Sequence, residues 1–186
     1  MRGPEPSPYR GRVTGHDHHQ HHPSPDERPR TATVITVSDR SARGERIDAS
    51  GPAAVRRLRA AGYLVDDPVV VPDGTEPVAA AIGAAVQGGA RVVLTSGGTG
   101  VGPRDLTPEG TRPVLGRELP GLAEALRRHG ADHNPAAVLG RGLAGTTVEG
   151  TVVVNLPGSP AAVEQSLDVL LPVLGHLLDQ LDGSDH

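Results

Sequence analysis

One stretch, residues 92–109, most constrains what this chain can fold into. It begins with an apolar, largely β-branched run that is typical of a buried strand. A loop follows at residues 96–102, where four of the seven residues are glycine. Glycine allows the backbone to take positive φ and to approach a ligand closely, and successive N–H groups in such a loop can converge on an anion. Arg104, Asp105 and a helix start at residues 107–109 come next, so the stretch predicts an anion-binding turn beside charged side chains.

Two familiar phosphate-binding motifs do not fit this loop. A P-loop requires a lysine after its second glycine, whereas Pro103 and Arg104 follow Gly102 and the chain contains no lysine. In the dinucleotide-binding pattern counted from Gly98, the third glycine arrives one residue early. A flexible turn after a buried strand is the plain alternative, and the adjoining arginine, carboxylate and helix start count against it.

The stretch TSGGTGVGPRDLTPE resembles the signature of the MoaB/Mog family, the molybdopterin adenylyltransferases of molybdenum cofactor synthesis. Three further stretches agree in order: VSDR at residues 37–40, VPD at 71–73 and NLPGSP at 155–160. The resemblance covers roughly residues 32–178. The same fold also occurs as a domain of the molybdenum-insertion enzyme, so a single motif would not separate the two.

Composition narrows the class of protein. The chain has 186 residues, which suits one domain at residues 31–182 and a tail at 1–30 that is too poor in apolar residues to order. Its histidine-rich run at 16–22 suits either metal capture or a solvated polar tail. A net charge of −4 and 1% aromatic residues argue against a nucleic-acid partner. The absence of cysteine, of an apolar run of membrane-span length and of a signal-like segment predicts a cytoplasmic protein with no membrane partner.

The order of elements predicts the fold. Apolar runs at residues 32–37, 69–71 and 151–156 alternate with amphipathic segments, for which Ser50, Thr75 and Ser159 are the expected helix caps. We therefore expect an α/β fold of three α/β/α layers with a mostly parallel central sheet. The glycine-containing junctions after Thr95 and after Leu156 should then lie at the same edge of that sheet.

The residues of these motifs are better suited to phosphate chemistry than to hydrolysis by a serine or cysteine nucleophile. There is no cysteine and no G-x-S-x-G elbow, and the histidines outside the tail lie away from the glycine motifs. A backbone anion site, a guanidinium and carboxylates that can hold Mg²⁺ recur in phosphoryl transfer.

The resemblance implies an enzyme that transfers AMP from Mg-ATP to the terminal phosphate of molybdopterin. It implies Mg²⁺ as cofactor, ATP as co-substrate, a homotrimer or hexamer, and the molybdenum-insertion enzyme as a further candidate partner. Asp73 and Asp105 would be catalytic and would hold the metal, while Asp39 could be either structural or functional. The implied substrate-binding residues are Ser38, Asp39, Thr95, Ser96, Gly97, Gly98, Thr99, Gly100, Arg104, Glu109, Pro157, Gly158 and Ser159. The alternative is a non-catalytic molybdopterin- or nucleotide-binding protein of the same fold.

Overall fold

The structure is a computed structural model that describes residues 29–183. The predicted tail at residues 1–30 and its histidine-rich run lie outside the described residues, apart from residues 29 and 30. The strands are β1 (Thr31–Val37), β2 (Leu64–Val65), β3 (Val69–Val71), β4 (Val92–Ser96), β5 (Arg117–Glu118), β6 (Ala144–Thr146) and β7 (Val152–Leu156). The α-helices are α1 (Asp39–Ala42), α2 (Ser50–Ala60), α3 (Thr75–Gln87), α4 (Thr107–Thr111), α5 (Pro120–His133) and α6 (Pro160–Leu181), and two 3-10 helices are η1 (Arg112–Val114) and η2 (Pro135–Leu139).

All the described strands belong to one sheet, in the order β2-β1-β4-β7-β6-β5, with β3 also paired to β1. The pairs of β1 with β2, β3 and β4, and of β4 with β7, are parallel. Only β6 and β5 add antiparallel pairs at one side. The predicted mostly parallel sheet is therefore confirmed, and its apolar β-branched strands are buried on both faces, as such sheets require.

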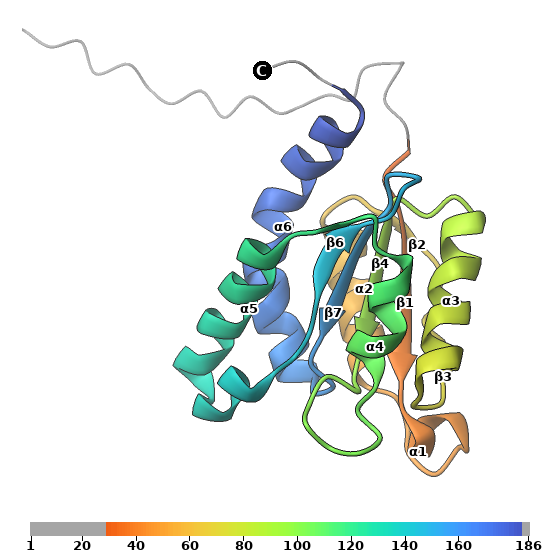
Figure 1. Cartoon of the computed structure of the whole chain (residues 1–186), viewed down its shortest axis with the longest axis vertical. Helices are drawn as coiled ribbons and strands as arrows, with labels where there is room; N and C mark the ends of the chain where they lie inside the picture. Colours follow the sequence, from red (N-terminus) through yellow and green to blue (C-terminus); the bar gives the residue numbers. More distant parts are fainter. Residues whose placement is uncertain (1–28, 184–186) are drawn as a thin grey trace, which may run out of the picture.

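Helices cover both faces of this sheet, which gives the predicted three layers (Figure 1). One apolar core joins the sheet to α2, α5 and α6, with Leu58, Leu167 and Leu174 among its fully buried side chains. The second core joins the opposite face to α3 through Val78 and Ile82. Helices α2, α3 and α6 thus each bury one apolar stripe, as the periodicity predicts.

Two of the expected helix caps were wrong. At α2 the N-cap is Ala49 and Ser50 is the first helical residue, because the Asp48 carboxylate accepts hydrogen bonds from the N–H groups of Ser50 and Gly51. At α3 the N-cap is Gly74, which has a φ of 145°. Ser159 does cap α6, where its hydroxyl accepts from Ala162 N at 3.2 Å.

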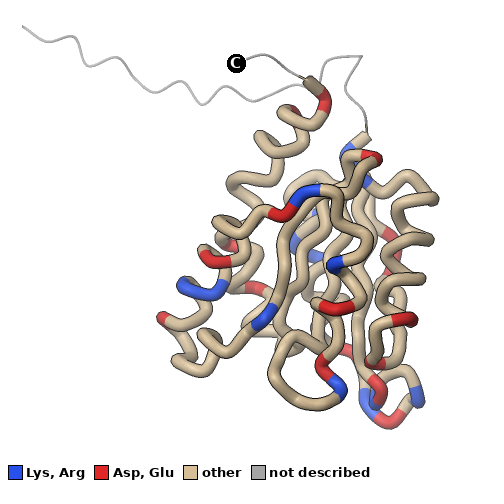
Figure 2. Tube along the Cα trace, in the orientation of Figure 1, with Lys and Arg blue, Asp and Glu red and all other residues tan. Residues whose placement is uncertain are grey.

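Helix α6 is, among the described residues, long and apolar enough to cross a membrane by length and composition alone. Its apolar stripe is nevertheless occupied, since Val163, Leu167, Leu170, Leu174 and Leu178 are buried in the core. A core helix accounts for its composition. Basic and acidic residues are interspersed along the whole described trace, without a long stretch of one sign (Figure 2).

Candidate functional site

The site lies at the edge of the sheet where the parallel strands end together. The register places Thr36 of β1 opposite Ser96 of β4, and Ser96 opposite Leu156 of β7. Val37 is opposite Val71, so β3 ends at the same level. The segments after four strands, predicted from separate motifs, therefore meet at one edge, where ligands bind in open α/β sheets.

The glycine-rich loop after β4 is fixed at its base by backbone contacts that only glycine permits. Gly97 has a φ of 107°, and a Cβ there would lie 2.3 Å from Val37 O. The Gly97 N–H donates to Leu156 O at 3.1 Å, and the Thr107 hydroxyl donates to Gly97 O at 2.8 Å. Gly98 has a φ of 63°, and its carbonyl accepts from Thr107 N at 3.0 Å. The junctions after Thr95 and after Leu156 are thus confirmed as neighbours.

The tip of this loop presents backbone donors that have no acceptor. Among residues 29–183, the N–H groups of Gly98, Thr99 and Gly100 donate to no protein atom. Unpaired N–H groups that follow one another in a glycine-rich turn favour a bound anion. This is the feature that the sequence predicted for residues 96–100.

Asp39, Asp73 and Arg104 form one connected group from three separate loops. Asp39 N donates to Asp73 Oδ2 at 2.7 Å, and Asp73 N donates to Asp39 Oδ1 at 3.2 Å. The Arg104 guanidinium contacts the Asp39 carboxylate through Nε at 3.1 Å and Nη2 at 2.7 Å, and Nη2 also donates to Asp73 O at 3.2 Å. The Asp39 carboxylate therefore binds both the backbone of Asp73 and the guanidinium of Arg104. These contacts agree with the interpretation of Asp39 as a structural residue.

The Asp105 carboxylate lies inside the loop that precedes it. Its Oδ2 accepts from Gly102 N at 2.8 Å, and a Cβ at Gly100 would lie 2.8 Å from the same oxygen. Asp73 contacts the other end of the loop, since a Cβ at Gly98 would lie 3.3 Å from Asp73 Oδ1. Within residues 29–183 no group of three or more histidine, cysteine or acidic side chains is placed to hold a metal ion.

Arg141 fixes the outer side of the loop and was missed by the sequence reasoning. Its Nε donates to Gly100 O at 2.6 Å, its Nη2 donates to Asp105 O, and its own N–H donates to Thr99 O at 2.9 Å. Nη1 makes an ion pair with Glu109, and this hydrogen bond lowers the pKa of the Glu109 carboxyl below its usual value. Arg141 is 41 residues from Gly100 in sequence, so no local pattern marks the contact.

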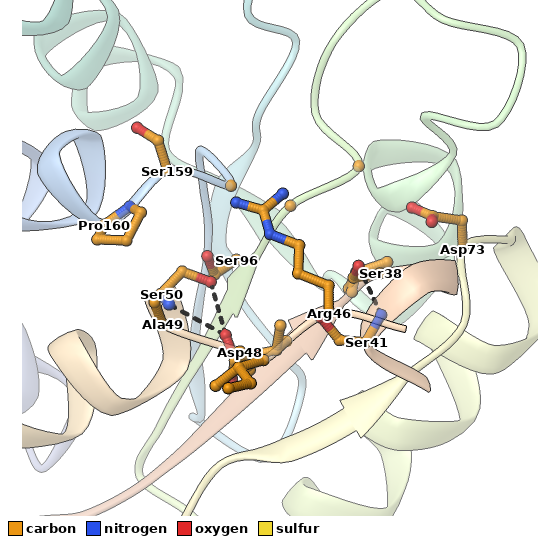
Figure 3. A pocket seen from close by; sticks show the side chains of 16 residues that line it. Ser38, Ser41, Arg46, Asp48, Ala49, Ser50, Asp73, Ser96, Ser159 and Pro160 are labelled. Atoms are coloured by element: carbon orange, nitrogen blue, oxygen red, sulfur yellow. Dashed lines mark hydrogen bonds between the residues drawn. The ribbon is translucent and has the colours of Figure 1, made fainter. Parts of the chain in front are cut away.

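Two cavities lie on either side of the glycine-rich loop. The first, of about 350 Å³, is formed by the ends of β1 and β4, by Asp73 and by the start of α2. Figure 3 shows its labelled polar side chains around the opening, including Ser38, Ser41 and Ser96. The second, of about 450 Å³, is formed by Thr99, by α5 and by η2. Gly158 and Ser159 line both cavities, so the two adjoin at the start of α6.

Most of the predicted site residues, whether substrate-binding or catalytic, line one of these cavities. Ser38, Asp73, Ser96, Gly97 and Gly98 line the first, Thr99, Gly100 and Pro157 line the second, and Gly158 and Ser159 line both. Five predicted residues line neither cavity and instead support the loops: Asp39, Thr95, Arg104, Asp105 and Glu109.

Thr95 lies beneath the site in a buried polar network. Its hydroxyl accepts from Asn155 Nδ2 at 2.9 Å, and the same amide donates to the Thr111 hydroxyl at 2.9 Å. Asn155 Oδ1 accepts from Leu143 N at 3.0 Å. Because every amide group of Asn155 is paired, the network fixes β4, α4 and the segment before β6 relative to one another.

Comparison with known proteins shows what this arrangement is similar to. The family model described as "Probable molybdopterin binding domain" matches residues 33–176. The "Molybdenum cofactor biosynthesis bifunctional protein" of Synechococcus elongatus is 41% identical over 155 residues, which is 83% of this chain and 48% of the relative. The chain therefore spans about half the length of such bifunctional relatives.

Relatives of similar length also match. The molybdopterin adenylyltransferase of Pyrococcus furiosus is 39% identical over 150 residues, which is 78% of this chain and 87% of the relative. Among solved structures, the molybdopterin biosynthesis Mog protein from Mycobacterium ulcerans superposes with a TM-score of 0.77 at 44% identity, covering 82% of this chain and 99% of that one.

Proposed function

Because this chain belongs to the family of molybdopterin-binding domains of molybdenum cofactor biosynthesis, we propose that it is a molybdopterin adenylyltransferase. The reaction would join AMP from Mg-ATP to the terminal phosphate of molybdopterin in the cytoplasm. An adenylyltransferase in Pyrococcus furiosus, similar along most of its length, supports this assignment.

The observation that carries the proposal is the pair of adjoining cavities at one loop with unpaired N–H groups. An adenylyl transfer needs two ligands whose phosphates meet, and each cavity is within the size range of small-molecule sites. We assign the nucleotide to the cavity that contains Asp73, and the pterin to the cavity that contains Thr99. The N–H groups of Thr99 and Gly100, which line the pterin cavity, would hold the molybdopterin phosphate, while Gly98 lines the nucleotide cavity.

The reaction requires no general base. A phosphate monoester loses its second proton near pH ~6, so the nucleophile is already largely ionised at neutral pH. Its oxygen would attack the α-phosphorus of ATP, and the bond from that phosphorus to the bridging oxygen would break, releasing pyrophosphate. The residues of the site then have to position two anions and balance their charge.

The carboxylates fit a role with Mg²⁺ that arrives on ATP. Proteins often hold Mg²⁺ by one or two carboxylates together with substrate phosphates, and Asp73 Oδ1 accepts no hydrogen bond among the described residues. Bound Mg²⁺ would neutralise charge on the ATP phosphates. Asp73 and Asp105 would hold it, and Arg104 would offset nucleotide charge through Nη1, which its contacts with Asp39 leave unused.

A direct assay tests this function. Purified protein is mixed with molybdopterin, ATP and Mg²⁺, and pyrophosphate release is followed together with adenylylated molybdopterin by mass spectrometry. We expect both products, and neither when molybdopterin is omitted. Tight binding of molybdopterin and ATP without either product would refute the transferase and favour the non-catalytic binding protein. The number of subunits, proposed as a trimer or hexamer, is measured separately by light scattering, and a pull-down tests contact with the molybdenum-insertion enzyme.

A further inference from the structure

Arg46 occupies a position in the first cavity that the proposed function does not use. It is the only arginine among the described residues that line this cavity, and the chain has no lysine. In Figure 3 its side chain extends across the cavity, with the guanidinium between Ser96 and Ser159 on one side and Ser38 and Asp73 on the other. The cavity therefore contains one cationic side chain, directed into its opening.

This guanidinium has no partner in the part of the chain that the structure describes. Among residues 29–183 Arg46 makes no hydrogen bond or ion pair, whereas the nearby Arg43 is paired with Glu45 at 2.8 Å. Arg104, the arginine that the sequence indicated for the nucleotide phosphates, is bound to the Asp39 carboxylate at 2.7 Å. The charge of Arg104 is thus already balanced, while that of Arg46 is not.

Neither of the carboxylates that share the cavity with Arg46 is bound to it. Asp48 Oδ1 accepts from the backbone and hydroxyl of Ser50 and from Gly51 N, and its Oδ2 accepts from the Thr36 hydroxyl at 2.7 Å. Asp73 Oδ2 accepts from the backbone of Asp39 at 2.7 Å. Neither carboxylate forms an ion pair with Arg46, so its planar fork of N–H donors is available to a ligand.

The chemistry of the cavity indicates an anion as that ligand. Arg46 approaches the cavity from the segment between α1 and α2, and the unpaired N–H of Gly98 lies on the wall formed by the glycine-rich loop. A guanidinium and an unpaired backbone N–H in the same small cavity match a phosphate, whose oxygens accept from both.

We propose that Arg46 is a phosphate-binding residue of the nucleotide site, which contacts the ATP phosphates from the side opposite the glycine-rich loop. This rests on the proposed function, because it takes the first cavity as the nucleotide cavity. Arg46 supplies positive charge on that side of the phosphates, while Arg104 also holds the loops of Asp39 and Asp73 together.

Binding measurements with two probes test this role. Isothermal titration with ATP, and separately with adenosine, is carried out in the presence of Mg²⁺ on the native chain and on Arg46→Ala, Arg46→Lys and Arg40→Ala. Arg40 is the matched control, because it is an exposed arginine of the adjacent helix α1 that lines neither cavity. Its loss changes the net charge equally.

We expect Arg46→Ala to weaken ATP binding about tenfold, the scale of one lost charge-assisted contact. Arg46→Lys should bind with intermediate affinity because it keeps the charge and loses the fork. Adenosine binding should not change in any variant, and Arg40→Ala should bind ATP as the native chain does. An ATP dissociation constant within twofold of native in Arg46→Ala, an equal loss for adenosine, or no ATP binding by the native chain would overturn the inference. Arg46-dependent ATP binding without pyrophosphate release in the presence of molybdopterin would refute the transferase and leave this role intact.

Discussion

Replacement of Gly98 by alanine should be the most informative single change in the loop. Gly98 has a φ of 63°, where an L-residue costs about 1–2 kcal/mol. The new Cβ would lie 2.3 Å from Thr107 Oγ1, far inside contact distance. The threonine cannot move freely, because it is fully buried and its hydroxyl donates to Gly97 O. Breaking that hydrogen bond adds about 1 kcal/mol, so we expect a total loss of roughly 2–3 kcal/mol of unfolding free energy.

Gly62→Ala provides the matched control for this change. Gly62 has a φ of 87°, but a Cβ there would meet nothing within 4 Å. It therefore tests the backbone strain without the steric overlap, and we expect a loss of only about 1 kcal/mol. The difference between the two variants isolates the contact of residue 98 with Thr107.

Urea denaturation of both variants, followed by circular dichroism, measures these free energies. Pyrophosphate binding measured on the folded protein should be lost in Gly98→Ala and kept in Gly62→Ala, because the new methyl group also displaces the loop donors. The double variant Gly98→Ala/Thr107→Ala should lose less stability than the sum of its single changes, by about 1 kcal/mol or more. Equal stability of Gly98→Ala and Gly62→Ala, with unchanged pyrophosphate binding, would refute the steric reasoning.

Three further changes test the supports of the site. Asp105→Asn keeps an acceptor for Gly102 N and should keep molybdopterin binding. We expect its rate of adenylylation in single-turnover assays to fall on the order of 100-fold. Weak molybdopterin binding with a normal rate of turnover would contradict the assignment. Because Arg141 lowers the pKa of Glu109, the pair stabilises the fold above pH 4.5, the usual carboxyl value, and this contribution disappears as the pH falls through the lowered pKa. The pair is partly exposed and contributes under about 1 kcal/mol of unfolding free energy. In Glu109→Gln the fall of the melting temperature at acid pH should therefore be smaller, by an amount that corresponds to this free energy. The same fall in the variant as in the native chain would exclude the linkage. Asn155→Leu leaves a backbone N–H and two threonine hydroxyls without their partner and should lose about 2–4 kcal/mol in urea, whereas a loss under 1 kcal/mol would mean that water replaces the amide.

The strands and the meeting of their ends could be predicted because they depend on local signals. The β-branched runs of β1, β4 and β7 mark buried parallel strands, and glycine after β4 marks the turn. Once the sheet is parallel, its topology brings the segments after those strands to one edge without further information.

What could not be predicted depends on contacts between distant segments. Helix α1 has four residues, too few for a periodic pattern, and the two-residue strand β5 carries no alternation. Asp48 replaces Ser50 as the group that receives the first N–H bonds of α2, since only the folded backbone shows which carboxylate reaches them. The contacts of Arg141 and the position of Arg46 in the first cavity depend on where their side chains point in the folded chain. The spacing of residues in the sequence does not indicate this.

The acidic residues of the site connect loops before any ligand is bound. Asp39 and Asp73, 34 residues apart in sequence, each donate the backbone N–H to the carboxylate of the other, and the Asp105 carboxylate accepts from Gly102 N within its own loop. These contacts set the loops in place, so a ligand need not spend binding free energy on ordering them. Some residues of the family motifs, such as Asp39 and Asp105, therefore hold the loops in place. Among residues 29–183, the groups of the site that remain unpaired, and so can meet a ligand, include the N–H groups from Gly98 to Gly100, Asp73 Oδ1 and the Arg46 guanidinium.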